Sequence, residues 1–265
     1  MIKDPQALIF RIKRWEDYYL FALESPQIAS RAVPGQFIMV RISPHPYPLL
    51  RRPFSIHDAS KTHLEIFFQV TGIGTELLSQ RRENDSLDIL GPLGKGFTTG
   101  PALAEKEVVA VGGGRGIAPL YYLAQVLRSE GASIRIFYGG QTLKDLPLRE
   151  KIEGDGFPLH CSTDDGSYGF KGLVSDYFAQ ELHKMNPSRI YSCGPELMME
   201  KIASLARNKN IPAEFSLESI MGCGIGACWS CVKRIQKEEG TEWTRICEEG
   251  PVFNGEDILW QGEEP

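Results

Sequence analysis

Four of the six cysteines lie close together near the C-terminus, and their spacing constrains the chain more than any other feature. Cys223, Cys228 and Cys231 fall within nine residues and Cys247 follows them, which gives the spacing C-x4-C-x2-C-x15-C. The first three intervals match the plant-type [2Fe–2S] pattern, in which four thiolates converge on two irons. The spacing therefore predicts a [2Fe–2S] cluster ligated by these four cysteines.

Two glycines between the first two cysteines support this interpretation. Gly224 and Gly226 tolerate the unusual backbone angles of a loop that wraps a cluster closely, and they let backbone N–H groups approach the sulfurs. The alternative is a structural zinc site with the same four thiolates. Zinc ribbons usually contain two C-x2-C knuckles, and only the pair Cys228 and Cys231 has that spacing here.

Length and charge restrict the remaining possibilities. The 265 residues suffice for two compact domains and a small appendage. A net charge of -5 gives little support to nucleic-acid binding. No apolar run is long enough to span a membrane, and the first residues contain no apolar signal core. We therefore expect a cytoplasmic protein whose thiols stay reduced.

The pattern of apolar residues predicts three domains. Residues 1–100 contain short strands separated by Pro and Gly, which indicates an antiparallel β-barrel. Residues 101–211 alternate strands and helices, which indicates a doubly wound parallel α/β domain. Residues 212–265 are rich in Cys and Gly and too short for an apolar core, so a cofactor would have to organise them. The expected strands are 8–15, 36–42, 54–58, 63–70, 86–90, 108–111, 134–138, 159–163 and 189–193, the expected helices are 117–130, 173–182 and 196–208, and 91–96 is expected as a linker.

Two stretches of the expected barrel suit a flavin nucleotide. In the first, Arg52 can neutralise a pyrophosphate, Phe54 can lie against a flat ring, and Ser55 can hydrogen-bond ring heteroatoms. The alternative is an ion pair for Arg52 and a core position for Phe54. The second stretch, residues 69–78, contains a strand end, a Gly-containing turn and a helix start with Thr75 as the expected N-cap, although a plain capped helix is the alternative.

A glycine-rich turn follows the first strand of the expected α/β domain. Its small residues would let a dinucleotide pyrophosphate approach the backbone at a helix N-terminus. The turn differs from the dehydrogenase fingerprint because a proline takes a different place in it. The residues expected to contact the nicotinamide nucleotide are Gly112, Gly113, Gly114, Gly116 and Pro119.

With these motifs in hand, the sequence resembles the ferredoxin–NADP reductase superfamily, and more narrowly the electron-transfer subunits of type B dihydroorotate dehydrogenases. The resemblance covers essentially the whole chain, and its most specific parts are residues 216–228 and 247–253. It implies that FAD is bound by Arg52, Pro53, Phe54, Ser55, Gln69, Val70, Thr71, Gly74 and Thr75. It also places Cys193, which precedes Gly194 and Pro195, where the nicotinamide approaches the flavin; a buried cysteine at a strand end is the alternative.

One residue of the glycine-rich turn departs from the family pattern. Position 115 is usually apolar in the family, whereas this chain has Arg115 there, which would contact a phosphate or point to solvent. NAD is favoured over NADP, because residues 139–142 after the second α/β strand contain no pair of basic residues for a 2′-phosphate.

The resemblance implies a chain of electron carriers. NAD(H) exchanges two electrons at once and the cluster one, and FAD can do both. The partner would be an FMN-containing dihydroorotate dehydrogenase catalytic subunit, in a heterotetramer with two copies of each subunit. We expect no acid–base triad, since the five histidines show no catalytic spacing. The alternatives are a reductase subunit of a hydrogenase, of a sulfite or sulfide reductase, or of a ferredoxin:NADP oxidoreductase, a redox sensor without turnover, and a zinc-binding module.

Overall fold

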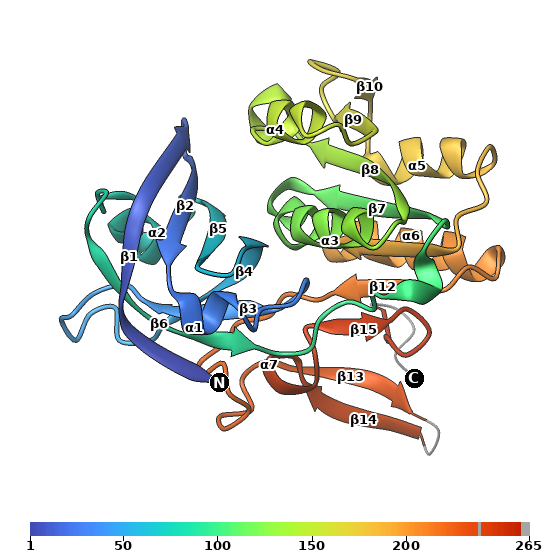
Figure 1. Cartoon of the computed structure of the whole chain (residues 1–265). Coiled ribbons are helices and arrows are strands. Elements are labelled where there is room, and N and C mark those ends of the chain that lie inside the picture. The colour runs from blue at the N-terminus through green and yellow to red at the C-terminus, as the bar shows by residue number, and fades with distance from the viewer. Residues whose placement is uncertain (238–239, 261–265) are drawn as a thin grey trace.

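The computed structural model describes residues 1–237 and 240–260, which form a barrel, an α/β sheet and a small C-terminal module (Figure 1). The barrel closes in the antiparallel order β1-β2-β5-β4-β3-β6. Its strands are β1 (Ile2–Trp15), β2 (Tyr18–Glu24), β3 (Phe37–Arg41), β4 (Arg52–Ala59), β5 (His63–Gln69) and β6 (Ser86–Leu93), and its short helices are α1 (Pro26–Ala29) and α2 (Ile73–Ser79). The predicted barrel is confirmed, although β2 was missed.

The expected linker at residues 91–96 is partly wrong. β6 continues to Leu93 because Gly91 still pairs with Ile2 of β1 and Leu93 pairs with Phe37 of β3. These pairs extend the wall of the barrel through the glycine and proline that suggested a break.

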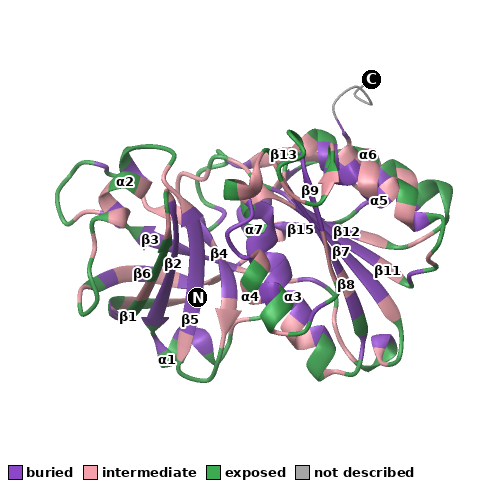
Figure 2. Cartoon of the chain, turned by 90° about the horizontal axis from the view of Figure 1, so that it is seen from above, coloured by how far each residue is buried: buried purple, intermediate pink, exposed green. Residues whose placement is uncertain are grey.

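The second part is a sheet in the order β10-β9-β8-β7-β11-β12-β15, in which only the β12–β15 pair is antiparallel. The strands are β7 (Glu107–Gly113), β8 (Ser133–Gly140), β9 (Leu159–Thr163), β10 (Phe170–Lys171), β11 (Arg189–Cys193), β12 (Ala213–Ser216) and β15 (Val252–Asn254). The helices are α3 (Ile117–Ser129), α4 (Arg149–Gly154), α5 (Val174–Leu182) and α6 (Glu196–Asn208), with 3-10 turns η1 (Pro101–Leu103), η2 (Gly114–Gly116) and η3 (Leu143–Asp145). Helices cover both faces, as the doubly wound prediction requires, and α3 lies between the sheet and the barrel (Figure 2).

The C-terminal module consists of the hairpin β13 (Val232–Lys237) and β14 (Gly240–Arg245), helix α7 (Ile246–Glu249) and the cysteine-containing loop before β13. It is continuous with the second part, because β12 and β15 complete the large sheet on either side of it in sequence. The expected border at residue 212 therefore falls just before β12, which pairs with β11 in the same sheet. The last five residues of the expected third domain lie outside the described residues.

The boundary between the barrel and α3 is buried. The ring of His57 on β4 stacks on Tyr121 of α3 with ring centroids 4.5 Å apart, and its Nδ1 lies 3.1 Å from the carbonyl oxygen of Ala118. Tyr122 donates a hydrogen bond of 2.9 Å to the carbonyl of Ala32 in the barrel. These contacts fix the helix that follows the glycine-rich turn against the outside of the barrel.

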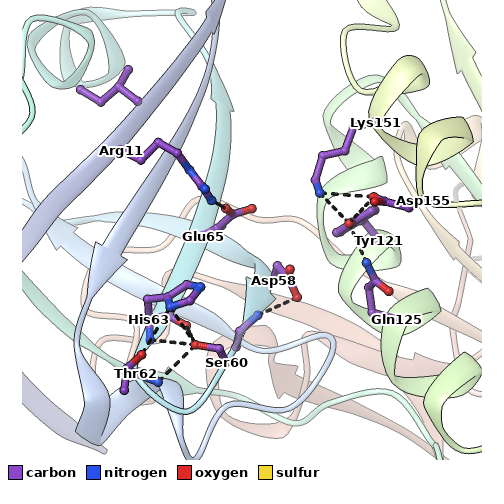
Figure 3. A network of polar contacts seen from close by, with 12 residues as sticks. Arg11, Asp58, Ser60, Thr62, His63, Glu65, Tyr121, Gln125, Lys151 and Asp155 are labelled. Carbon is purple, nitrogen blue, oxygen red and sulfur yellow. Dashed lines mark hydrogen bonds and ion pairs between the residues drawn. The ribbon is translucent and has the colours of Figure 1, made fainter.

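A polar network continues on the far side of Tyr121 (Figure 3). The Tyr121 hydroxyl donates to Asp155 at 2.6 Å and accepts from Lys151 at 2.6 Å and from Gln125 at 2.7 Å. Burial, together with the bond to Asp155, raises the pKa of Tyr121 to about 12, so the hydroxyl stays protonated and keeps α4 tied to α3. Within the described part of the chain, no helix has the length and apolar character needed to cross a membrane.

Candidate cofactor sites

The glycine-rich turn and the Cys-Gly-Pro segment meet where the strand order of the large sheet reverses. From β7 the chain proceeds outward to β10 and then returns to β11 on the other side of β7, and Cys193 pairs with Gly112. Ligands of open α/β sheets bind in the crevice at such a switch point, beyond the carboxyl ends of the strands. A β-carbon on Gly116 would collide with the carbonyl of Cys193, so glycine there allows the two turns to pack.

A cavity of about 790 Å³ opens at this switch point. It is lined by residues of the barrel, of the α/β part and of the C-terminal module. Of the residues expected at the nicotinamide nucleotide, Gly113, Gly114 and Gly116 line it, and Gly114 has a left-handed φ of 53° with open space beside it. Gly112 and Pro119 are buried outside the lining, where Gly112 packs against Ile117.

Cys193 lies beneath the cavity floor. Its side chain is buried and absent from the lining, whereas Gly194 and Pro195 directly after it are exposed to the cavity. Burial, and to a lesser extent the carboxylate of Glu218, raise the pKa of the Cys193 thiol well above its usual range. Cys193 is therefore a neutral thiol that supports the floor.

In the barrel, Arg52 and Arg51 have different surroundings. Arg51 is neutralised by Asp88, whose two carboxylate oxygens lie 2.8 and 2.9 Å from Nη2. Among the described residues, the hydrogen-bond partners of Arg52 are backbone carbonyls, such as that of Leu50 at 2.8 Å, and its side chain lies over Gly74. An arginine without a carboxylate partner beside a glycine at a helix start fits the pyrophosphate of a flavin dinucleotide.

The other residues of the two barrel stretches have mixed positions. The ring of Phe54 is buried in the barrel against Phe68, with centroids 5.6 Å apart, which agrees with the alternative of a core position. Ser55 is half-buried on the alternate face of β4. Thr75 is the third residue of α2 and not the N-cap, which is Gly72; its hydroxyl accepts from the backbone N–H of Thr71 and Gly72. Pro53 lies in β4, and Val70 and Thr71 follow the end of β5. Among the described residues expected to bind FAD, Gln69 is the one that lines the cavity.

Two polar contacts between described residues of the cavity lining join the barrel to the α/β part. Arg115 donates to Gln69 at 3.1 Å, and Tyr18 donates to Asp145 at 2.9 Å. An exposed ion pair outside the lining, Lys144 with Glu16 at 3.1 Å, joins the same two parts. Burial and the bond to Asp145 raise the pKa of Tyr18 above its usual range, so the hydroxyl remains a donor. Tyr18 and Asp145 were missed from sequence, and no motif marks either of them.

The four cysteines of the C-terminal module differ in how far they are buried. Cys231 and Cys247 are buried, Cys223 is half-buried and Cys228 is exposed. Backbone N–H groups point to three of the sulfurs: Gly226 to Cys247 at 3.1 Å, Ile225 to Cys223 at 3.4 Å and Cys247 to Cys231 at 3.5 Å. Both glycines of the loop have left-handed φ angles, 73° at Gly224 and 80° at Gly226.

The electrostatics differ between the exposed and the buried cysteines. The hydroxyl and backbone of Ser230 lower the pKa of Cys228 to about 6, which favours the thiolate that binds iron. Burial raises the pKa of Cys247 to about 12, and the N–H group of Gly226 opposes this by donating to its sulfur.

Arg245 holds the cysteine loop from the opposite side. Its Nη1 donates to the carbonyl of Gly226 at 2.9 Å, its guanidinium lies 4.9 Å from the ring centre of Trp229, and it pairs with Glu248 and Glu249, both at 2.7 Å. Arg245 thus connects the loop to α7, which contains the fourth cysteine. It was not predicted from sequence.

The arrangement suits two irons better than a single metal ion. In residues 1–237 and 240–260, no three His, Cys, Asp or Glu side chains converge closely enough to hold one ion. The buried cysteines Cys231 and Cys247 lie together, since the backbone N–H of Cys247 faces the Cys231 sulfur, whereas Cys228 is exposed. A [2Fe–2S] cluster needs two thiolates for each iron, whereas structural zinc needs four ligands around one centre.

Comparisons with known proteins agree with this geometry. Residues 218–259 match the family model "iron-sulfur cluster binding domain of dihydroorotate dehydrogenase B", and residues 110–204 match the "oxidoreductase NAD-binding domain". The predictions of an iron–sulfur domain and of a NAD-binding domain are therefore confirmed. The zinc-module alternative finds no support in these matches.

The structure resembles solved flavoprotein reductases. A NADH-dependent reduced ferredoxin-NADP oxidoreductase, studied for flavin-based electron bifurcation, is 29% identical and has a TM-score of 0.83, covering 97% of this chain and 91% of its own. A ferredoxin NADP+ reductase from Neisseria gonorrhoeae, solved with bound FAD and NADP, is 17% identical with a TM-score of 0.66, covering 78% of this chain and 91% of its own, and shares the fold.

Two relatives that match this chain over nearly their whole length have the same protein name. The protein "dihydroorotate dehydrogenase B (NAD(+)), electron transfer subunit" of Desulforamulus reducens is 38% identical over 92% of this chain and 93% of its own length. Its namesake in Shouchella clausii is 37% identical over 97% of this chain and all of its own length. The chain therefore belongs to the family of electron transfer subunits of NAD-dependent dihydroorotate dehydrogenase B, and it is an oxidoreductase subunit that works with a catalytic partner.

Proposed function

We propose that this subunit moves electrons between NAD(H) in the switch-point cavity and a partner's redox centre, by way of FAD on the barrel and a [2Fe–2S] cluster in the C-terminal module. The observation that carries the proposal is the lining of the cavity. Tyr18 and Gln69 come from the barrel, Gly113 and Gly194 from the α/β part, and Lys233 from the C-terminal module. A nucleotide in this cavity would therefore touch all three parts of the chain.

For the flavin, we assign the pyrophosphate to Arg52 and Gly74, and the neighbouring backbone and hydroxyl contacts to Pro53, Ser55 and residues 69–75. Arg52 supports the assignment because its charge lacks a carboxylate partner in the described structure, whereas the charge of Arg51 is neutralised by Asp88. Phe54 would contribute through its backbone, since its ring is in the core. When bound, flavin exchanges electron pairs with a nicotinamide and single electrons with a cluster.

For the cluster, we assign the ligands as two couples, Cys223 with Cys228 and Cys231 with Cys247. The N–H groups of Gly226 and Ile225 would donate to ligand sulfurs and stabilise the reduced state, in which the cluster has more negative charge. Burial of Cys231 and Cys247 and exposure of Cys228 orient one edge of the site toward the protein surface.

We place the partner on this exposed edge. Ile220 and Trp229 on the cysteine loop are 87% and 55% exposed, and Ile225 between them is also exposed. Exposed apolar side chains grouped around a redox site are typical of an interface with another protein. The partner is then an FMN-containing dihydroorotate dehydrogenase catalytic subunit, in a heterotetramer with two copies of each. A cytoplasmic location agrees with Cys161 and Cys193, which remain buried free thiols.

A single substitution separates the two ends of this path. We expect Cys228→Ser to keep bound FAD and rapid bleaching of flavin absorbance by NADH, because the cavity and the barrel are untouched. Transfer from NADH to the purified catalytic partner should fall by more than about tenfold, since loss of a ligand or of its environment changes metal affinity on that scale. Cys161→Ala, which removes a buried thiol distant from the loop, is the matched control and should transfer at the wild-type rate.

Three measurements decide the proposal: iron and acid-labile sulfide content, flavin bleaching in stopped flow, and NAD-dependent turnover with the partner. If Cys228→Ser reduced the partner as fast as wild type, the cluster would not lie on the path. If wild type contained zinc and no sulfide, the site assignment would be wrong.

A further inference from the structure

Arg115 occupies an unusual place at the cavity. It lies in η2, the turn between β7 and α3, and its side chain is exposed and lines the cavity. Its Nη1 donates to Gln69 Oε1 at 3.1 Å, and Gln69 in turn donates from Nε2 to Asp17 at 2.8 Å. The guanidinium is therefore held at the boundary between the barrel and the α/β part, with most of its N–H groups available.

The charges lining the cavity make Arg115 distinct. The lining contains two other cations, and each is paired with a carboxylate: Lys201 with Asp176, and Lys233 with Glu196. Across the described residues, the partner found for Arg115 is the neutral amide of Gln69. Within that part of the chain, Arg115 is thus the cation of the cavity lining for which no ion pair with a carboxylate is found.

The carboxylates that line the cavity restrict where an anionic group of a ligand can bind. Asp145 and Asp164 line the cavity beside Gly139 and Gly140, and Glu218 lines it on the side of the C-terminal module. These carboxylates would repel a phosphate from their surroundings. An anionic group in the cavity is therefore stabilised next to Arg115 and destabilised near the end of β8.

We propose that Arg115 is a positioning residue that binds the pyrophosphate of the nicotinamide dinucleotide and, through Gln69, holds it at a fixed place against the flavin-binding barrel. A guanidinium forms paired, charge-assisted hydrogen bonds with phosphate oxygens. The carboxylates near β8 then face the adenosine ribose, where a 2′-phosphate would be repelled. This inference rests on the proposed nucleotide site in the switch-point cavity.

The test compares Arg115→Ala, Arg115→Lys and Lys144→Ala in the complete flavin-loaded protein. Lys144 is the matched control because it too is an exposed cation that bridges to the barrel, but it lies outside the cavity lining. The probe is ADP-ribose, which has the pyrophosphate and no redox-active ring, titrated by calorimetry at several KCl concentrations. Steady-state NADH oxidation provides the kinetic parameters.

We expect Arg115→Ala to raise the Kd for ADP-ribose roughly tenfold to hundredfold, the usual loss for a hydrogen bond to a charged group. The KM for NADH should rise in parallel and kcat should stay within about twofold, because the pyrophosphate does not react. The salt dependence of the Kd should weaken in Arg115→Ala and persist in Arg115→Lys, which should recover part of the affinity. Lys144→Ala should match wild type.

Two outcomes would overturn the inference. One is an Arg115→Ala protein whose Kd for ADP-ribose stays within about twofold of wild type. The other is a loss of affinity that appears together with loss of bound flavin, which would place the role of Arg115 in the barrel. A wild-type protein that binds neither ADP-ribose nor NAD+ would instead contradict the nucleotide site itself, which separates the two failures.

Discussion

The cysteine loop and the switch-point cavity are assembled in different ways. The loop takes its shape from its own backbone: N–H groups of Gly226 and Ile225 face the sulfurs, and both glycines adopt left-handed angles. The cavity takes its walls from distant parts of the chain, from Tyr18 in the barrel to Lys233 in the C-terminal module. A local site should fail completely when its backbone is disturbed, whereas a composite site should lose affinity in steps.

The largest expected effect is on the loop. We expect Gly226→Ala to lose the cluster, because alanine is strained at the left-handed φ of 80° that points the Gly226 N–H at Cys247. Its β-carbon would also displace the Glu248 carboxylate from Arg245. Iron content and transfer to a one-electron acceptor should fall roughly tenfold or more. Flavin bleaching by NADH should persist, because the barrel and the cavity keep their geometry.

The control for that variant is Gly100→Ala. Gly100 also has a positive φ, 123°, but nothing lies within 4 Å of the position that a β-carbon would take, so this change tests backbone strain alone. If both variants lost the cluster equally, or if Gly226→Ala kept it, the loop would not be the tightly determined site described above.

The same contrast explains what could be predicted from the sequence. The cluster was predictable because three ligands lie within nine residues and the spacing itself encodes the site. Arg245 was missed because its role depends on the β13–β14 hairpin, whose pairing of Val232 with Arg245 returns the arginine to the loop. Sequence distance concealed a contact that strand pairing creates.

The cavity was predictable only in part. The strand–turn–helix around Gly114 and the strand before Gly194 were recognised, and the strand order brings them together. Tyr18 was missed because β2 is buried along almost its entire length, so it lacks the alternation that indicates a strand. The sequence left Phe54 open between a flavin contact and a core position, because an aromatic ring suits both, and the structure packs its ring against Phe68 in the barrel core.

A medium effect is expected at His57, in the buried boundary between the barrel and α3. Burial lowers the pKa of His57 from 6.5 to about 3, with Lys151 lowering it further and Asp155 and the Ala118 carbonyl opposing. Below about pH 6.5 the unfolded chain therefore binds a proton that the folded chain excludes. The free energy of unfolding should fall by about 1.4 kcal/mol per pH unit down to about pH 3, which amounts to about 2 kcal/mol at pH 5.

The measurement is the thermal midpoint at pH 7.5 and at pH 5.0. His57→Phe, which keeps an aromatic ring against Tyr121 and cannot take up a proton, should show a drop smaller than that of wild type by roughly 4 to 8 °C. His45→Gln, at an exposed histidine, should behave as wild type. Equal drops in wild type and His57→Phe would mean that the protonation of His57 does not cause the loss of stability.

The smallest expected effect is at the cavity mouth, where removal of one atom tests whether the walls act in steps. Tyr18→Phe deletes the hydroxyl that donates to Asp145 and keeps the ring stacked on Phe67. A hydrogen bond to a charged group contributes about 1.5 to 3 kcal/mol, and this one holds the cavity wall without touching the nucleotide, so only part of it bears on binding. The KM for NADH should therefore rise by roughly threefold to tenfold with kcat nearly unchanged. Tyr19→Phe, one residue along in the barrel core, should leave both parameters at wild-type values. If Tyr18→Phe abolished turnover as completely as Gly226→Ala abolishes the cluster, the cavity would be as indivisible as the loop, because a composite wall loses only the share of binding that one contact supplies.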